Sequence, residues 1–271
     1  MIARRIGEKR GLGVGGGYCP WIKVRDFSSD GRSHMPWAAT TGRKHQYLSD
    51  LELAFHRWAD FSPHICDIRE QFPLFPVSET KAIAEDLGIR HPVYPRTSVD
   101  TVLTTDFVLT LAHDKLTLLA RSVKYCKDLR DQRVLENLEL EKQYWNRRGI
   151  DWRLVTERDM SQVVLKNLSW LCRGLTESYD DQVKQRFLRA LTEARPTDTL
   201  RGALETAGRR ADLNRQQAFV LFQHLVWTHG KLPWNQGVVS EFSSMAKNVY
   251  RARGEFNCAV PYDGLRCLLV G

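Results

Sequence analysis

The sequence predicts an α/β protein with two domains, a sheet-containing domain over residues 1–175 and a mainly helical domain over residues 176–271. Two adjacent apolar segments, 102–111 and 116–125, have the composition of neighbouring strands. A polar break at 173–181 separates this region from a run of helical patterns. With 271 residues, 42% of them hydrophobic, the chain can bury two cores.

Three features are expected before the strands. Leu51, Phe55 and Trp58 recur at helical spacing, which predicts a helix with one face on the core. Residues 80–87 form a short helical patch in a proline-containing stretch. The glycine-rich segment 11–17 lacks the Gly-Lys-Ser/Thr ending of a phosphate-binding loop, so we interpret it as a flexible connector.

The two apolar segments are predicted to form a hairpin that is covered on both faces. If residues 113–115 are its loop, Asp106 lies opposite Ser122 and shares a face with Lys124. A four-residue loop would pair Asp106 with Arg121 and turn Lys124 to the other face, because a slip of one residue inverts a strand. Both registers are open from the sequence.

Further elements are expected after the hairpin. A helix is predicted over 132–148, a strand over 152–156 and a last helix of this domain over 167–172. The predicted order of elements in this domain is therefore helix, hairpin, helix and strand.

The C-terminal region is predicted to contain three helices, marked by Val183, by Leu204 and by the apolar run 218–227. Shorter, glycine-punctuated segments begin at 231–234. Three helices followed by short strands are typical of a winged helix. An apolar third helix has few side chains that could recognise DNA bases. The sequence therefore leaves open whether this region contacts protein or DNA.

Glu52, Asp106, Ser122 and Lys124 are the candidate catalytic residues. Metal-dependent phosphodiester hydrolysis uses a divalent cation, and hard cations such as Mg²⁺ take carboxylate and carbonyl ligands. Glu52 and Asp106 would supply carboxylates and the backbone near Val123 a carbonyl. Ser122 and Lys124, two apart on one strand, share a face, and Lys124 would orient the attacking water. The pattern predicts a nuclease.

Each of these residues also has a simpler interpretation. Ser49 and Glu52 have the spacing of a capping box, in which the glutamate returns a hydrogen bond at a helix start. Asp106 fits an ordinary acid at a strand end and Lys124 a solvated lysine. The spacing alone therefore leaves these roles open.

Several short motifs occur in order along the chain and are specific when taken together. They are Ile2-Ala-Arg-Arg-Ile6, Gly31-Arg-Ser-His34, Leu48-Ser-Asp-Leu-Glu-Leu-Ala54, Asp67-Ile-Arg-Glu-Gln-Phe-Pro-Leu74, Leu87-Gly-Ile-Arg-His-Pro-Val93 and Thr104-Thr-Asp-Phe107. In these motifs the sequence resembles the TnsA family, the endonuclease subunits of heteromeric transposases of bacterial cut-and-paste transposons. The resemblance covers roughly residues 2–172 and is weak beyond them.

This resemblance implies a restriction-endonuclease-like nuclease domain followed by a winged-helix domain. It implies a Mg²⁺-dependent DNA endonuclease, with Mn²⁺ able to substitute, that cuts the strand at the 5′ ends of the transposon. The implied partners are transposon-end DNA, an integrase-type transposase subunit and an AAA+ ATPase regulator. Glu52, Asp106 and Lys124 fall on the catalytic acids and lysine of the family. Ser122 is a departure, because the family often has Gln there and related nucleases have Glu.

Two other functions are open from the sequence. One is a restriction or repair nuclease of the same fold. The other is a catalytically decayed DNA-binding adaptor of a transposition complex, for which Ser122 would be the sign of decay.

Positive charge is concentrated at the two ends of the chain. The net charge is +8, and residues 1–50 contribute +5, residues 201–271 contribute +4 and the middle −1. Both ends are candidate phosphate-binding surfaces. The predicted DNA contacts are Arg4, Arg5, Lys9, Arg10, Arg32, Arg43, Arg209, Arg210 and Arg215.

The remaining composition narrows the class of protein. The six cysteines include no Cys-x-x-Cys pair and the eight histidines show no zinc spacing. No apolar segment has the length of a membrane span, and the first ten residues are not those of a signal peptide. We therefore expect a cytoplasmic bacterial protein with reduced thiols.

Overall fold

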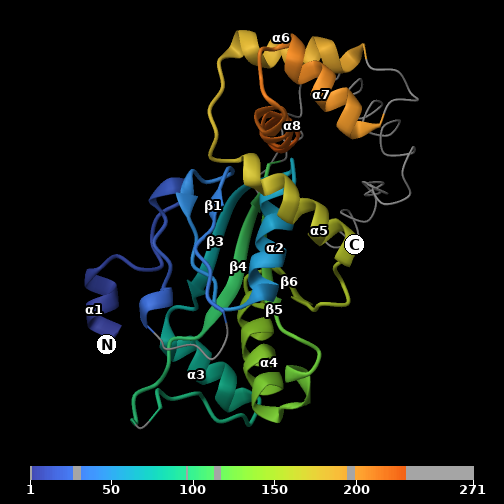
Figure 1. Cartoon of the computed structure of the whole chain (residues 1–271). Helices are drawn as coiled ribbons and strands as arrows, with labels where there is room; N and C mark the ends of the chain where they lie inside the picture. Colours follow the sequence, from blue (N-terminus) through green and yellow to red (C-terminus); the bar gives the residue numbers. More distant parts are fainter. Residues whose placement is uncertain (1, 27–31, 96, 113–116, 194–198, 230–271) are drawn as a thin grey trace. The chain divides into compact units, whose positions relative to one another are not determined.

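A computed structural model describes residues 2–26, 32–95, 97–112, 117–193 and 199–229 (Figure 1). The chain divides into two compact units. The first comprises Met1–Asp60 and His64–Met160, and the second comprises Phe61–Pro63 and Ser161–Gly271. Within the described ranges, no helix is both long and apolar enough to cross a membrane.

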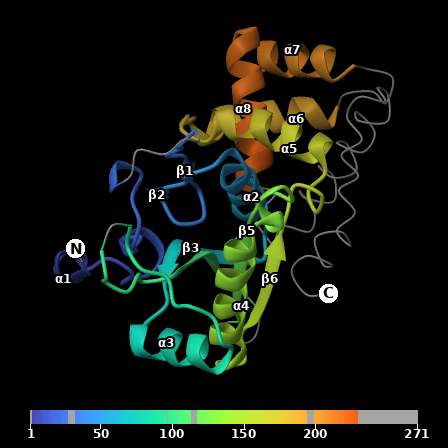
Figure 2. The same ribbon diagram turned by 90° about the horizontal axis from the view of Figure 1, so that it is seen from below.

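The first unit contains a four-stranded mixed sheet. Its strand order is β3 (Ile65–Pro73), β4 (Thr104–Leu111), β5 (Thr117–Val123) and β6 (Asp151–Val155). The first three strands are antiparallel, and β6 lies parallel to β5. A parallel neighbour needs a crossover connection, and α4 (Gln132–Asn146) provides it, as Figure 2 shows. The predicted α/β class is therefore confirmed.

The two faces of the sheet have separate cores. Phe107 of β4 packs against Phe55 of α2 (Asp50–Phe61), with ring centroids 4.7 Å apart. Its neighbour Val108 belongs to a cluster on the opposite side with Leu140 and Trp145 of α4. The side chains of adjacent β4 residues thus point to opposite faces of the sheet. Asp106 and Val108 are two residues apart, so their side chains lie on the same face.

The register of the hairpin decides whether the candidate residues can meet. Phe107 pairs with Arg121 and Leu111 with Thr117. This is the register expected for a loop over 113–115, and it continues to Asp106 opposite Ser122. The predicted shared face is therefore confirmed.

The remaining elements of this unit are short. They are α1 (Ile2–Gly7), η1 (Gly15–Gly17), η2 (Val24–Asp26), β1 (Trp37–Ala38), β2 (Arg43–Lys44), α3 (Val77–Asp86) and η3 (Asp128–Arg130). The helix predicted from residue 80 begins at Val77, directly after Pro76.

The glycine-rich segment is packed against the sheet, so its interpretation as a flexible connector was wrong. The N–H of Gly15 donates to Asp67 of β3 at 3.1 Å, and Gly15 accepts from Arg43 at 3.1 Å. A Cβ on Gly11 would lie 2.3 Å from the ring of Pro73. Close approach to β3 requires glycine at Gly11, and a left-handed backbone favours it at Gly13 and Gly15.

A buried polar network holds β2 to β3. Arg43 donates to both carboxylate oxygens of Glu70, at 2.8 and 2.6 Å, and His45 lies 2.8 Å from the same carboxylate. Tyr47 connects His45 to His56 of α2. Although burial opposes ionisation, the bonds from Arg43 and His45 lower the pKa of Glu70 to about 2.

This network predicts an acid-sensitive contribution to stability. Because the pKa of Glu70 is depressed on folding, its contribution is complete above the unfolded value near 4.5 and is lost as the pH falls towards 2. The shift corresponds to about 3 kcal/mol. We expect Glu70→Gln to lower the free energy of unfolding at pH 7 and to flatten its decline between pH 4.5 and 2, measured by urea denaturation. Glu85→Gln, at an exposed position of α3, is the control and should leave both quantities unchanged.

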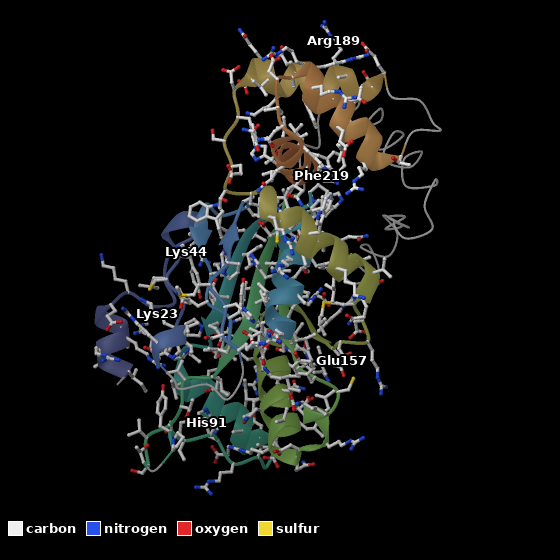
Figure 3. The ribbon with its side chains drawn as sticks, in the orientation of Figure 1. Lys23, Lys44, His91, Glu157, Arg189 and Phe219 are labelled. Carbon is white, nitrogen blue, oxygen red and sulfur yellow. The ribbon has the colours of Figure 1, made fainter. Side chains whose placement is uncertain are left out.

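The second unit is helical where the structure describes it. It contains α5 (Gln162–Leu171), η4 (Cys172–Gly174), α6 (Asp181–Thr192), α7 (Leu200–Arg210) and α8 (Arg215–His229). The apolar α8 is its central helix, because Leu221, Phe222 and Leu225 are buried among residues of α6 and α7. Phe219, labelled in Figure 3, packs against the same cluster. Burial therefore explains why this helix is apolar.

The compact units divide at Met160/Ser161, whereas we expected a domain boundary after residue 175. Trp170 of α5 contacts Phe222 of α8, and Gly174 of η4 approaches the backbone of His224 too closely to accept a Cβ. The short strands expected of a winged helix fall within 230–271, outside the described residues, so that assignment stays a prediction.

Candidate functional site

Asp106 and Lys124 meet at one end of the sheet. The ammonium of Lys124 lies 2.8 Å from Asp106 Oδ2, and the backbone N–H of Val123 donates to the same oxygen at 2.8 Å. The Asp106 carboxylate thus accepts a hydrogen bond from the backbone of β5, just beyond the residues that pair β4 with β5. The ligand role expected of the Val123 carbonyl stays a prediction.

Glu52 reaches this site from the first turn of α2. It caps the helix in a variant of the predicted box: the N–H of Glu52 donates to Ser49 Oγ at 3.1 Å, and Ser49 Oγ donates to Glu52 Oε1 at 2.9 Å. The backbone N–H that Glu52 binds in return is that of Leu48, at 3.2 Å, rather than that of Ser49. The other oxygen, Oε2, lies 3.3 Å from Gln71 Nε2, which is also 3.4 Å from Asp106 Oδ1. One buried glutamate therefore caps the helix and approaches Asp106.

The two acids and the lysine are electrostatically coupled. Burial and the negative charge of Asp106 raise the pKa of Glu52 to about 7. Burial disfavours the charged form of Lys124, but its bond to Asp106 and the charge of Glu52 outweigh this and raise the lysine pKa above its ordinary value. Lys124 therefore stays positively charged, and its side chain is 34% exposed.

Ser122 belongs to a second group of polar side chains, on the α4 side. Its hydroxyl donates to Glu141 of α4, and Trp152 Nε1 donates to Glu141 Oε1 at 3.1 Å. Burial first, and then the charge of Asp106, raise the pKa of Glu141 to about 7. Ser122 thus binds a third carboxylate, that of Glu141, which lies close enough to Asp106 for the charge of Asp106 to affect its pKa.

The donor set fits a hard divalent cation. The oxygens of Glu52 and Asp106 suit Mg²⁺, which keeps several water ligands and needs only one or two carboxylates from the protein. In the part of the chain that the structure describes, no three His, Cys, Asp or Glu side chains form a complete metal-binding group. Water or substrate oxygens would have to complete the coordination.

Comparison with known proteins agrees with this geometry. Residues 62–157 match the TnsA-like endonuclease N-terminal domain. The Transposon Tn7 transposition protein TnsA of Escherichia coli is 45% identical over 177 residues, which cover 65% of this chain and 64% of that protein. Over these residues the chain is similar to the TnsA family.

The TnsA-like match covers part of the candidate site. It includes Asp106, Ser122 and Lys124 and begins after Glu52. The chain spans 64% of the length of the curated relative that it matches.

Three of the basic residues predicted to bind DNA are buried against carboxylates in the structure. The side chains of Arg5 and Arg10 are 2% and 1% exposed and pair with Asp26, and Arg43 is bound to Glu70. Burying a guanidinium with its carboxylate removes it from phosphate, so we withdraw these three from the proposed DNA surface.

The other predicted DNA contacts are exposed. Arg32, 83% exposed, pairs with Asp50, two residues before Glu52 on α2. The other five side chains also face solvent; they are Arg4, Lys9, Arg209, Arg210 and Arg215. All six remain predictions.

Sequence reasoning missed Gln71 and Glu141. Glu141 was recognised only as part of the helix over 132–148, although it interrupts an apolar stripe between Leu138 and Trp145. A charged residue on a core-facing stripe is a usable signal, because buried carboxylates need partners. Gln71 has no comparable signal in the sequence.

Because Ser122 faces Glu141, we expect it to contribute little to catalysis directly. Ser122→Ala removes one hydrogen bond to Glu141 but leaves the bond from Trp152. We expect less than a tenfold loss in the rate of DNA cleavage and a loss in unfolding free energy of about 1 kcal/mol. Both are measurable on the same purified variant, in a cleavage assay and a denaturation curve. A complete loss of cleavage by a folded Ser122→Ala protein would show that the hydroxyl is essential.

Proposed function

We propose that this protein is a metal-dependent DNA endonuclease subunit of a transposition complex, which hydrolyses the strand at the 5′ ends of the transposon. The observation that carries the proposal is the convergence of Glu52, Asp106 and Lys124 at one end of the sheet. Similarity to the TnsA family supports the same activity.

The side chains suggest how the reaction would run. Glu52 and Asp106 would hold Mg²⁺, or Mn²⁺ in its place, and the bound cation would polarise the phosphate and acidify water. Lys124 carries a fixed positive charge beside Asp106, and its partial exposure lets it reach substrate. It would orient the attacking water or stabilise the charge that develops on the phosphate oxygens.

The proposed substrate and partners rest on the similarity to the TnsA family. We propose that the protein acts on transposon-end DNA together with an integrase-type transposase subunit, which would process the 3′ ends, and an AAA+ ATPase regulator. Residues 176–271 are proposed to contact the regulator or DNA. A cutter that depends on partners to place DNA should be nearly inert alone.

The test is strand-specific cleavage of transposon-end DNA labelled at each 5′ end. The full chain is incubated with and without its partner subunits, in Mg²⁺ or in EDTA. We expect 5′-strand cleavage only with partners and Mg²⁺ present. Cleavage of arbitrary plasmid DNA by the protein alone would favour the restriction or repair nuclease. Assembly with the partners on DNA, without 5′ cleavage in Mg²⁺, would favour the decayed adaptor.

A further inference from the structure

Gln71 has an unusual backbone conformation for a buried strand residue. It lies near the end of β3 with φ at 47°, a left-handed value that residues other than glycine rarely adopt. Among the described non-glycine residues, Lys9 and Asp212 share a positive φ, but both are exposed turn residues. Gln71 is 3% exposed. Such a conformation at a buried strand position points to a functional constraint.

The side chain of Gln71 joins the two candidate acids. Its Nε2 lies 3.3 Å from Glu52 Oε2 and 3.4 Å from Asp106 Oδ1. At the other end of the amide, Oε1 accepts from Thr104 Oγ1 at 3.2 Å, which fixes the orientation of the amide. Because Nε2 carries two hydrogens, it can serve both carboxylates at once.

The bonds to Gln71 are the longest that these carboxylates make. Asp106 Oδ2 receives Lys124 and the N–H of Val123, both at 2.8 Å, and Glu52 Oε1 receives Ser49 Oγ at 2.9 Å. Glu52 Oε2 accepts only long bonds, from the N–H of Leu48 at 3.2 Å and from Gln71 at 3.3 Å, and it shares Gln71 with Asp106 Oδ1. They are the two oxygens best placed for a shared cation.

We propose that Gln71 is a positioning residue, whose amide holds Glu52 and Asp106 at the separation at which both carboxylates bind one divalent cation. The role in cleavage rests on the proposed function. The hydrogen-bond coupling of Gln71 to the two acids does not, and it is measurable without DNA.

The first measurement is binding of Mn²⁺ to the full chain by titration calorimetry. Gln71→Met keeps an unbranched side chain of similar length but removes both N–H groups. We expect Mn²⁺ affinity to fall about tenfold and the Mg²⁺ concentration for half-maximal cleavage to rise by a similar factor. The cleavage rate at saturating Mg²⁺ should stay within about threefold of the wild type, because the cation then holds the acids itself.

The second measurement is a double-mutant cycle on thermal unfolding in EDTA. Gln71→Met should lower the midpoint strongly in the wild type, where two carboxylates lose their common donor. It should lower it much less in Glu52→Gln, where one negative charge is already absent. Equal effects in the two backgrounds would mean that Gln71 does not couple to Glu52, and would overturn the inference.

Gln71→Glu covers the case in which Gln71→Met does not fold. It keeps the shape of the side chain and replaces the donors with a third negative charge. We expect a lower midpoint than wild type in EDTA and a larger rise on adding Mn²⁺. Equal midpoints and equal rises in the two proteins would overturn the inference.

Gln143→Leu is the matched control, since its amide donates to Glu139 on α4 at 2.6 Å. It should leave Mn²⁺ affinity unchanged. If Asp106→Ala loses Mn²⁺ binding while Gln71→Met keeps it within twofold, the inference is overturned and the proposed function stands. If the wild type binds no Mn²⁺, the proposed metal site fails instead.

Discussion

Asp106→Asn is expected to lower the rate of 5′-strand cleavage by about 100-fold or more. The substitution removes a negative ligand of the proposed cation and the carboxylate that binds Lys124. It keeps a carbonyl oxygen that can still accept from the N–H of Val123, which alanine would leave unpaired. A loss of rate is therefore separable from a loss of fold.

The measurement is single-turnover cleavage of end-labelled DNA in the assembled complex, with circular dichroism of the same preparation. Asp100→Asn is the matched control, because Asp100 pairs with Lys81 at 2.7 Å outside the site. It should cleave at the wild-type rate. Full activity of a folded Asp106→Asn protein would exclude Asp106 from the catalytic site.

Glu52→Gln is expected to inactivate the protein to a similar extent, about 100-fold. Glutamine keeps an oxygen that can accept from Ser49 Oγ, and the bond from the backbone N–H of residue 52 to Ser49 Oγ does not depend on the side chain. Glutamine loses the charge that would bind a cation. If Glu52 acts only as a capping residue, the variant should cleave within about twofold of wild type, and the same cleavage assay distinguishes the two roles.

The pH dependence of Glu52 gives an independent check. Its pKa of about 7 means that, in the metal-free protein, the carboxyl holds a proton below that pH. A cation must displace this proton, so Mn²⁺ binding should strengthen as the pH rises through 7. In Glu52→Gln this part of the pH dependence should disappear. Titration calorimetry at pH 6, 7 and 8 measures it, and an identical pH profile in both proteins would contradict the assignment.

The core of the fold was predictable because its patterns are local. The strands β4, β5 and β6, the helix through Phe55 and the helix over 132–148 follow from the pattern of apolar residues, whereas β3 was not predicted. Loop length restricted the hairpin to two registers, and only one of them places Asp106 and Lys124 on one face. The structure has that register.

The rest depends on contacts between residues far apart in sequence. The sequence does not show that Arg10 pairs with Asp26, sixteen residues away. It also does not show that the backbone of Gln71 is left-handed. The glycines at 11–17 were misread because composition does not reveal that β3 lies against them. The sequence left open whether Glu52 caps the helix or takes part in catalysis. In the structure it caps the helix, and the same side chain approaches Asp106 through Gln71.

The division of the chain at α2 limits how it can be dissected. Phe61, the last residue of this helix, belongs to the helical unit, where its ring lies 5.2 Å from that of Trp227. Glu52, near the first residue of the same helix, belongs to the other unit. Truncation of the chain after Met160 would therefore remove Trp227, the aromatic partner of Phe61. Phe61 lies on α2, the helix that also carries the candidate acid Glu52. A fragment shortened in this way reports on the integrity of α2 as well as on the missing helices, so an inactive fragment would not by itself assign a role to the C-terminal region.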